Sequence, residues 1–167
     1  MYNLNLIDMK TNKIKLTLLL ALFGVFISNA QSPFEVLEEP LPYSKMASSF
    51  TINIIGYNED FVMTEWQKYI TDFSGVTYIK TINKGVIDME SKGVVFPLLN
   101  DDKVTLHTRF SPNRALTGVL LTVWIEKEDG TFFSSETNKK EAKRIKDWLF
   151  EFQNKIRVLN KRIIYKE

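Results

Sequence analysis

The side chain best suited to chemistry in this sequence is His107, its only histidine. A histidine can act as a general base or as a metal ligand near neutral pH. The sequence has no cysteine, and no serine stands in a nucleophile-elbow motif. Alternation with Leu106 and Thr108 directs His107 away from the apolar face of its strand. We therefore interpret it as an ordinary strand residue and assign no catalytic residue.

Two groups of carboxylates lie in expected turns. Asp101 and Asp102 form one pair, and Glu126, Glu128 and Asp129 form the second group. Paired carboxylates can bind calcium or share a proton, but neither group has the spacing of an EF-hand loop. Acidic residues are common in turns because they hydrogen-bond to the local backbone. Nucleotide-binding glycine motifs and zinc-ligand clusters are also absent from the sequence, so we predict no metal site and no cofactor.

Two arginines are candidate binding residues. Arg109 and Arg114 flank a polar segment, residues 111–113, that joins two of the longest predicted strands. The planar guanidinium group suits the recognition of anions. Loops held by rigid strands often carry functional residues. Arg109 and Arg114 are therefore assigned to a possible ligand or partner site.

Leu120 and Trp124 are the other two candidate binding residues. They share the strand face opposite to Val123 and Ile125. Large apolar side chains on both faces mean that a second layer covers this face or that an apolar patch is open to a ligand or partner. We favour coverage by the N-terminal arm, residues 31–49.

The spacing of apolar residues predicts two amphipathic helices. Asn58 is expected to cap the first, over residues 59–73, because its side chain can accept a hydrogen bond from the first turn. The second begins near Ser135 or Thr137 and continues to about Ile163. Its length lets the last turns project beyond a small sheet.

Alternating apolar residues predict five or six short strands. Short polar turns connect them, residues 91–93 among them, and such turns favour antiparallel neighbours. The predicted fold is α+β: an antiparallel sheet of about five or six strands, with one helix after the first strand and the long C-terminal helix packed on one face. Trp66 and Trp148 are expected to lie deepest. The expected strands are residues 50–55, 76–82, 86–90, 94–99, 104–110 and 118–127.

Residues 1–30 are predicted to be a signal peptide. A lysine-containing segment precedes an unbroken apolar run over residues 16–27, and small residues then suit cleavage before Gln31. The apolar run is too short for a transmembrane helix, which needs about 20 residues. Translation from Met1 or from Met9 gives the same exported product.

The exported chain is expected to carry an extended, proline-containing lead-in over residues 31–49 and a single α+β domain over residues 50–167. Without the leader, 19 of the 22 basic and 19 of the 20 acidic residues remain. This neutral balance argues against a nucleic-acid partner, since such affinity comes mostly from neutralising phosphates. The absence of cysteine excludes disulfides, thiol catalysis and a lipoprotein anchor. We expect a soluble periplasmic or extracellular protein with no stable membrane anchor after cleavage.

Three stretches carry a resemblance to other proteins. The FVMTEWQKY sequence of residues 61–69, GVVFP of residues 93–97 and VWI of residues 123–125, followed by a long helix, resemble a group of small exported bacterial proteins of unknown function. This resemblance implies no activity. The order of elements is also similar to that of helix-grip folds, in which a long C-terminal helix packs on a curved sheet around an apolar cavity. A likeness of topology does not fix a function.

These patterns favour a non-enzymatic binding or interaction protein whose partner is an unknown protein or a small apolar ligand. The candidate surfaces are the end of the C-terminal helix, the loop between Arg109 and Arg114, and the outer sheet face with Leu120 and Trp124. One alternative is a carrier with an apolar ligand between the sheet and the C-terminal helix, which predicts a cavity lined by residues such as Val123, Trp148 and Phe152. A second is a hydrolase, which predicts a cleft that gathers His107 with carboxylates.

Overall fold

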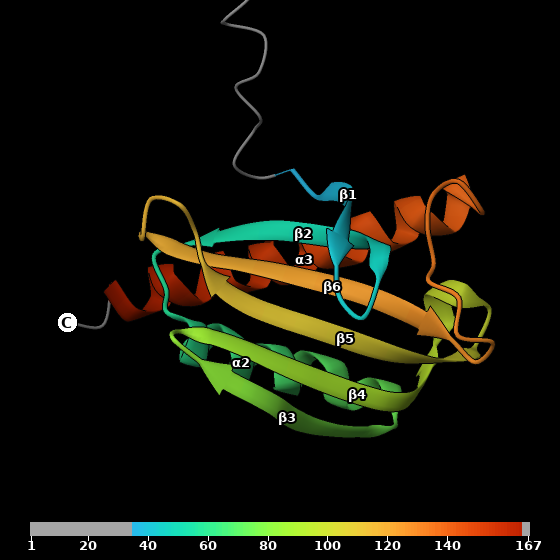
Figure 1. The fold of residues 1–167 in the computed structure, drawn as a ribbon. Helices are drawn as coiled ribbons and strands as arrows, with labels where there is room; N and C mark the ends of the chain where they lie inside the picture. The colour runs from blue at the N-terminus through green and yellow to red at the C-terminus, as the bar shows by residue number, and fades with distance from the viewer. Residues whose placement is uncertain (1–34, 165–167) are drawn as a thin grey trace, which may run out of the picture. The chain divides into compact units, whose positions relative to one another are not determined.

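The computed structural model describes residues 35–164, which form an α+β structure. The predicted leader lies outside these residues. Six antiparallel strands make one sheet in the order β1-β2-β6-β5-β4-β3, and this confirms the predicted fold class (Figure 1). The elements are β1 (Leu37–Pro42), β2 (Met46–Ile55), α2 (Glu59–Ile70), η1 (Thr71–Phe73), β3 (Val76–Asn83), β4 (Val86–Phe96), η2 (Pro97–Leu99), β5 (Asp102–Pro112), β6 (Gly118–Lys127) and α3 (Lys139–Ile164).

The sheet combines a local meander with one distant pairing. Strands β3 to β6 follow one another both in the chain and in the sheet. Strand β2 then pairs with β6, with Phe50 opposite Val123. Strand β1 folds back on β2 as a hairpin and forms one edge of the sheet. Residues 37–49 were predicted to belong to the extended lead-in, but they contribute β1 and the start of β2.

Strand β4 differs from its prediction. The sequence suggested two strands separated by a turn at residues 91–93, but β4 is one strand that pairs with β5 along its length. The register with β5 shifts between Ser91 and Val94, which is a β-bulge. Gly93 has a φ of 67°, so it absorbs the extra residue at little steric cost. The predicted strand also ends early, because Pro97 begins η2.

Both helices begin with an asparagine cap. The Asn58 side chain accepts a hydrogen bond of 3.0 Å from the Phe61 N–H, which confirms the predicted cap of α2. For α3 the prediction was wrong: the cap is Asn138, whose side chain accepts bonds of 3.2 and 3.3 Å from the N–H groups of Lys140 and Glu141. The predicted cap Thr137 instead closes the preceding turn.

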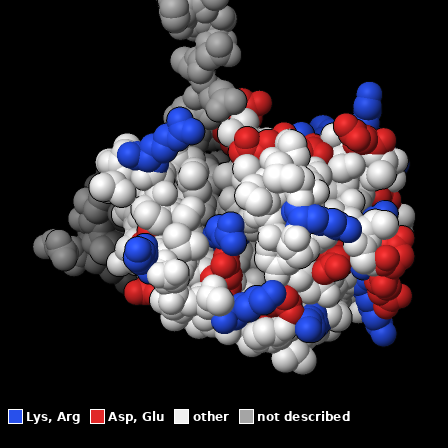
Figure 2. All heavy atoms as spheres, viewed as in Figure 1, with Lys and Arg blue, Asp and Glu red and all other residues white. Residues whose placement is uncertain are grey.

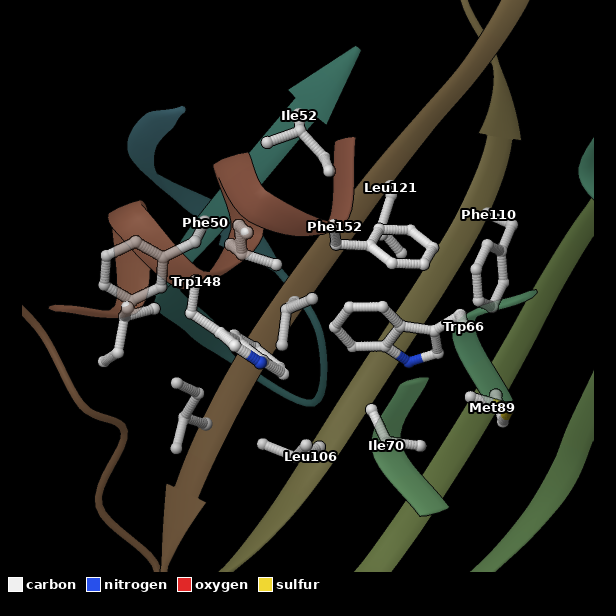
Figure 3. Packing of buried hydrophobic residues seen from close by; sticks show 14 of the residues in the cluster. Phe50, Ile52, Trp66, Ile70, Met89, Leu106, Phe110, Leu121, Trp148 and Phe152 are labelled. Atoms are coloured by element: carbon white, nitrogen blue, oxygen red, sulfur yellow. The ribbon is translucent and has the colours of Figure 1, made fainter. Parts of the chain in front are cut away.

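The hydrophobic core lies between the sheet and the two helices, which cover the same face (Figure 1). Trp66 of α2 and Trp148 of α3 are both buried there, as predicted, with ring centroids 5.1 Å apart. Phe152 packs edge-on against Trp66 (Figure 3). The indole N–H groups of the two tryptophans have no hydrogen-bond partner among the described residues. Within residues 35–164, no helix is long and apolar enough to span a membrane.

Candidate functional site

The sheet face turned away from the helices, here called the outer face, carries a row of polar side chains. Cross-strand register places Glu90 of β4 opposite His107 of β5, and His107 opposite Trp124 of β6. Two residues along the strands, Asp88 lies opposite Arg109. Alternation explains this arrangement, because the neighbours of these residues in sequence point into the core. The outer face is thus built from side chains of several strands, and the strand register decides which of them lie opposite one another.

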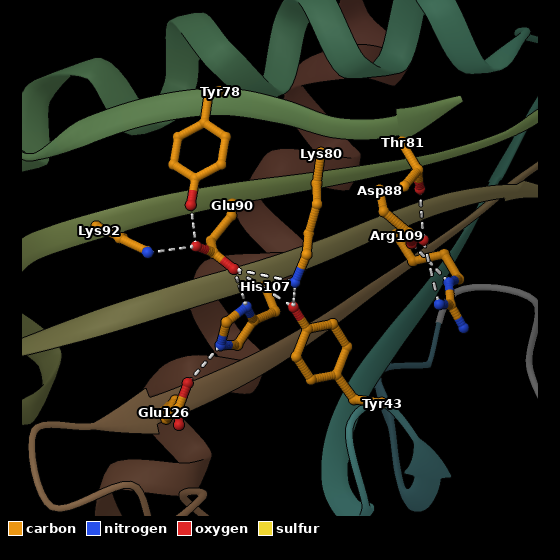
Figure 4. A network of polar contacts seen from close by, with 10 residues as sticks. All are labelled: Tyr43, Tyr78, Lys80, Thr81, Asp88, Glu90, Lys92, His107, Arg109 and Glu126. Carbon is orange, nitrogen blue, oxygen red and sulfur yellow. Dashed lines mark hydrogen bonds and ion pairs between the residues drawn. The ribbon is translucent and has the colours of Figure 1, made fainter. Parts of the chain in front are cut away.

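Glu90 is the centre of a polar cluster, the Glu90 network, shown in Figure 4. The Tyr78 hydroxyl donates a short hydrogen bond to Glu90 Oε1, and Lys92 Nζ lies 3.0 Å from the same oxygen. Lys80 Nζ lies 3.5 Å from Glu90 Oε2, and His107 Nδ1 lies 3.2 Å from it. The members of the Glu90 network are Tyr43, Tyr78, Lys80, Glu90, Lys92, His107 and Glu126.

These contacts keep Glu90 ionised although it is buried. Burial by itself raises the pKa of this carboxyl. The hydrogen bonds from Tyr78 and Lys92 and the positive charges of His107 and Lys80 act in the opposite direction and prevail, so the pKa of Glu90 falls to about 2. Glu90 therefore carries its negative charge through the whole neutral and mildly acidic range.

His107 lies between two carboxylates. Its Nε2 is 2.6 Å from Glu126 Oε2, while its Nδ1 faces Glu90 without the alignment of a hydrogen bond. Glu126 and Glu90 therefore lie at opposite nitrogens of the imidazole ring. Alternation placed His107 correctly on the outer face, but the flanking carboxylates come from two neighbouring strands.

The β1–β2 hairpin covers the middle of the outer face. The Tyr43 ring lies 4.3 Å from the His107 ring and 5.5 Å from that of Trp124, measured between centroids. The Trp124 indole N–H donates to the Leu41 carbonyl at 3.4 Å. Figure 1 shows this hairpin in front of β6. Trp124 is therefore buried, and the expectation that the N-terminal arm covers it is confirmed.

Tyr43 also joins the hairpin to the far side of the sheet. Its hydroxyl accepts a hydrogen bond of 2.8 Å from Lys80 Nζ and donates one of 3.4 Å to Glu90. The bond to Tyr43 outweighs the opposing effect of burial and raises the pKa of Lys80. Lys80 belongs to β3, the edge strand opposite to β1, so its contact with Tyr43 links the hairpin to the opposite edge of the sheet.

The four predicted binding residues are only partly brought together. Arg109 lies within β5 and not in a loop, and its Nε donates to Asp88 Oδ1 at 2.7 Å. Its guanidinium carbon is 5.4 Å from the centre of the Trp124 ring. Leu120 is half-buried on the same face, whereas Arg114 is exposed in the turn before β6. Arg109 is thus occupied by an ion pair rather than placed in an anion-binding loop.

The two edges of the sheet are different. Strand β1 carries Pro40 and Pro42 and two glutamates, features that discourage another strand from pairing. Strand β3, at the other edge, has the sequence VTYIKTIN, and all eight of its residues are exposed. Its apolar side chains keep much of their surface in contact with solvent: Val76 69%, Tyr78 39%, Ile79 43% and Ile82 68%.

The inner side of β3 extends the core-facing layer beyond the helices. Ile79 lies opposite Met89, and Ile82 lies opposite Ile87. The two isoleucines are three residues apart, and they share the inner side because the register with β4 shifts between Ile79 and Thr81, as in a β-bulge. Met89 and Ile87 are buried, yet their β3 neighbours are not. The sequence predicted a strand here but could not indicate that it forms an edge, because this depends on the strand order. The edge is the feature of this surface that sequence reasoning missed.

The hollows on the surface of the described residues include three near turns and strand ends. One, of about 630 Å³, lies between the β1–β2 hairpin and the segment that leads to α3, and Glu38 and Lys146 line it. The others flank the β3–β4 turn and the end of β6. None of the three is lined by His107, Val123, Trp148 or Phe152. Among the described residues, no group of three or more acidic or histidine side chains could hold a metal ion.

Comparisons of the chain with protein-family models, with curated proteins and with solved structures give no match. The resemblance to small exported bacterial proteins therefore stays a prediction.

Proposed function

We propose that this chain is an exported, non-enzymatic binding protein that takes up an extended segment of a protein partner along β3. In this mode the added segment forms hydrogen bonds to the free edge of the sheet, and its side chains provide specificity. The observation that carries the proposal is the exposure of all eight residues of an edge strand that has no proline.

The contrast between the edges supports this role. Exposed edge strands attract other chains, and proteins usually protect them with prolines, charges or short length. Strand β1 has two prolines and two glutamates, whereas β3 has no proline and exposes Ile79 and Ile82, with one lysine and one register shift with β4 as its protection. An edge that retains this liability in a folded protein is expected to have a use.

The Glu90 network also supports the role, because it fixes β3 before a partner arrives. Tyr78 and Lys80, both on β3, bind Glu90 of the neighbouring strand. Edge strands with few buried contacts otherwise tend to open locally. A strand held in its binding conformation loses less conformational entropy on association, which favours affinity.

The alternatives have less support in the described geometry. A hydrolase needs a histidine that can reach its substrate, but Tyr43 covers His107 and both ring nitrogens face carboxylates. A carrier needs an apolar cavity, but Trp148 and Phe152 pack against aromatic neighbours in the core.

The proposal can be tested by selection from a displayed library of random linear peptides on the immobilised full chain. Peptides that bind the wild-type chain should bind the double variant Ile79→Lys, Ile82→Lys at least tenfold more weakly, because the two added charges discourage another strand from pairing with β3. The matched control is Val158→Lys on α3, because Val158 is 51% exposed, a value between those of Ile79 and Ile82. It should leave the affinity unchanged.

Hydrogen exchange adds a structural readout to this selection. Amides of β3 that point away from β4 should exchange rapidly in the free chain and slowly when a selected peptide is bound. Failure to select any peptide, or peptides that bind wild type and the double variant equally, would overturn the proposal. Circular dichroism spectra of the variants check that they fold.

A further inference from the structure

We propose that the segment bound along β3 alternates apolar and acidic side chains. This inference rests on the proposed function and adds the chemistry of the partner. A strand added to β3 would direct its successive side chains alternately to the outer and inner faces of the sheet on each side of the register shift between Ile79 and Thr81. The two faces beside β3 differ in character, so they select different side chains at alternate positions.

The inner side of β3 selects apolar residues. Ile79 and Ile82 lie there, next to the buried side chains of Met89 and Ile87. Side chains on neighbouring strands that face the same way contact each other directly. Apolar residues of a partner would cover the exposed part of both isoleucines and extend the core by one strand, and this burial of apolar surface favours association.

The outer side of β3 selects acidic residues. Lys80 lies on β3 and Lys92 on the neighbouring β4, and their side chains are 49% and 61% exposed. The carboxylate between them, Glu90, is buried, and the nearby Asp88 is paired with Arg109. Figure 2 shows blue side chains rising from the part of this face formed by β3 and β4, with smaller red areas between them. The accessible charge beside the edge is therefore positive.

A second copy of this chain fits the edge less well. Strand β3 contains Lys80 and no acidic residue. Two β3 strands that pair antiparallel about their centres would bring the two Lys80 side chains together, and like charges on neighbouring strands are destabilising. The complementary charge must come from another sequence. Eight residues of strand at about 3.3 Å each span about 26 Å, so a peptide of eight or nine residues covers the edge.

Three synthetic nine-residue peptides test the inference with the full chain: one alternating valine with glutamate, one alternating valine with lysine, and one with the glutamates and valines in separate blocks. Binding is measured by isothermal titration calorimetry at low and high salt. We expect the valine–glutamate alternation to bind at least tenfold more tightly than either of the others. Its affinity should fall with added salt, because exposed charge pairs are screened.

Variants assign the preference to the lysines. Lys80→Gln and Lys92→Gln should each weaken binding of the valine–glutamate peptide threefold or more and reduce its salt dependence. The matched control is Lys143→Gln, an exposed lysine of α3, which should change neither quantity. Salt dependence of the wild-type chain gives a second readout, independent of any effect of these substitutions on folding.

The outcomes separate this inference from the proposed function. Equal binding of the glutamate and lysine peptides, lost in Ile79→Lys, Ile82→Lys, would overturn the inference and leave strand addition at β3 in place. A dimer in solution that the same double variant abolishes would make a second copy the occupant and would also overturn it. No binding by any peptide, together with an empty selection from the random library, would overturn both.

Discussion

Replacement of Glu90 by glutamine should change stability by an amount that depends on pH. The carboxyl is 6% exposed, and its pKa is lowered from an ordinary value of 4.5 to about 2. At about 1.4 kcal/mol per pKa unit, this difference contributes about 3 kcal/mol to the free energy of unfolding. Glutamine keeps the shape of the side chain but removes the charge that the neighbouring cations surround.

The direction of the pH effect follows from linkage. A group whose pKa is lower in the folded state stabilises the fold above its unfolded pKa, here 4.5, and this contribution is lost as the pH falls toward 2. By pH 3 about 2 kcal/mol of it should be gone. The stability gap between wild type and Glu90→Gln should therefore be about 2 kcal/mol larger at pH 7 than at pH 3.

Urea unfolding followed by circular dichroism at the two pH values measures this gap. Other carboxyl groups titrate in both proteins, so their effects cancel in the difference. Asp147→Asn is the matched control, because Asp147 forms an exposed ion pair with Lys143 and such pairs contribute little. The unfolding free energies of wild type and Asp147→Asn should differ by less than about 0.5 kcal/mol at both pH values. A Glu90→Gln gap that is the same at pH 7 and pH 3 would refute the account of the Glu90 network.

Two further substitutions test the packing and the helix cap. Gly118→Ala should destabilise the fold by about 1–3 kcal/mol, because the added Cβ would clash with the Ile54 carbonyl oxygen and lie 2.7 Å from the Ile55 Cα. The measurement is the midpoint of thermal unfolding, which should fall. An unchanged midpoint would mean that β2 and β6 can move apart freely. Asn138→Ala should lower the free energy of unfolding, measured in urea, by about 1 kcal/mol, because the α3 cap is lost. Asn138→Asp should retain most of that stability, since aspartate can also cap a helix. Equal losses of stability in the two variants would contradict the capping role.

The sequence predicted the parts of the fold that depend on local patterns. Asn58 and the residues after it define a helix start by side-chain chemistry alone, and the limits of β6 follow from its alternation. Local patterns were ambiguous at Gly93, because a glycine with positive φ serves a turn and a β-bulge equally well. The result was one strand where two had been expected.

The candidate site could not be predicted in the same way, because its residues meet only through strand register. His107 lies opposite Glu90 after β4 and β5 have paired, and Glu126 reaches it from β6. The open edge at β3 likewise follows from the strand order. Alternation gave the face on which each side chain lies, but not its neighbours.

The pairing of β2 with β6 also sets the order in which the sheet can form. The Thr51 and Thr122 hydroxyls hydrogen-bond across this pair although they are 71 positions apart in the chain. Strands β3 to β6 can assemble as successive hairpins. The pairing of β2 with β6 must first close a long loop, and the entropy cost of this closure comes before any stabilising contact between the two strands forms. We expect insertion of β2 beside β6 to limit the folding rate. The β1–β2 hairpin, which carries Tyr43, should reach the outer face only after that step.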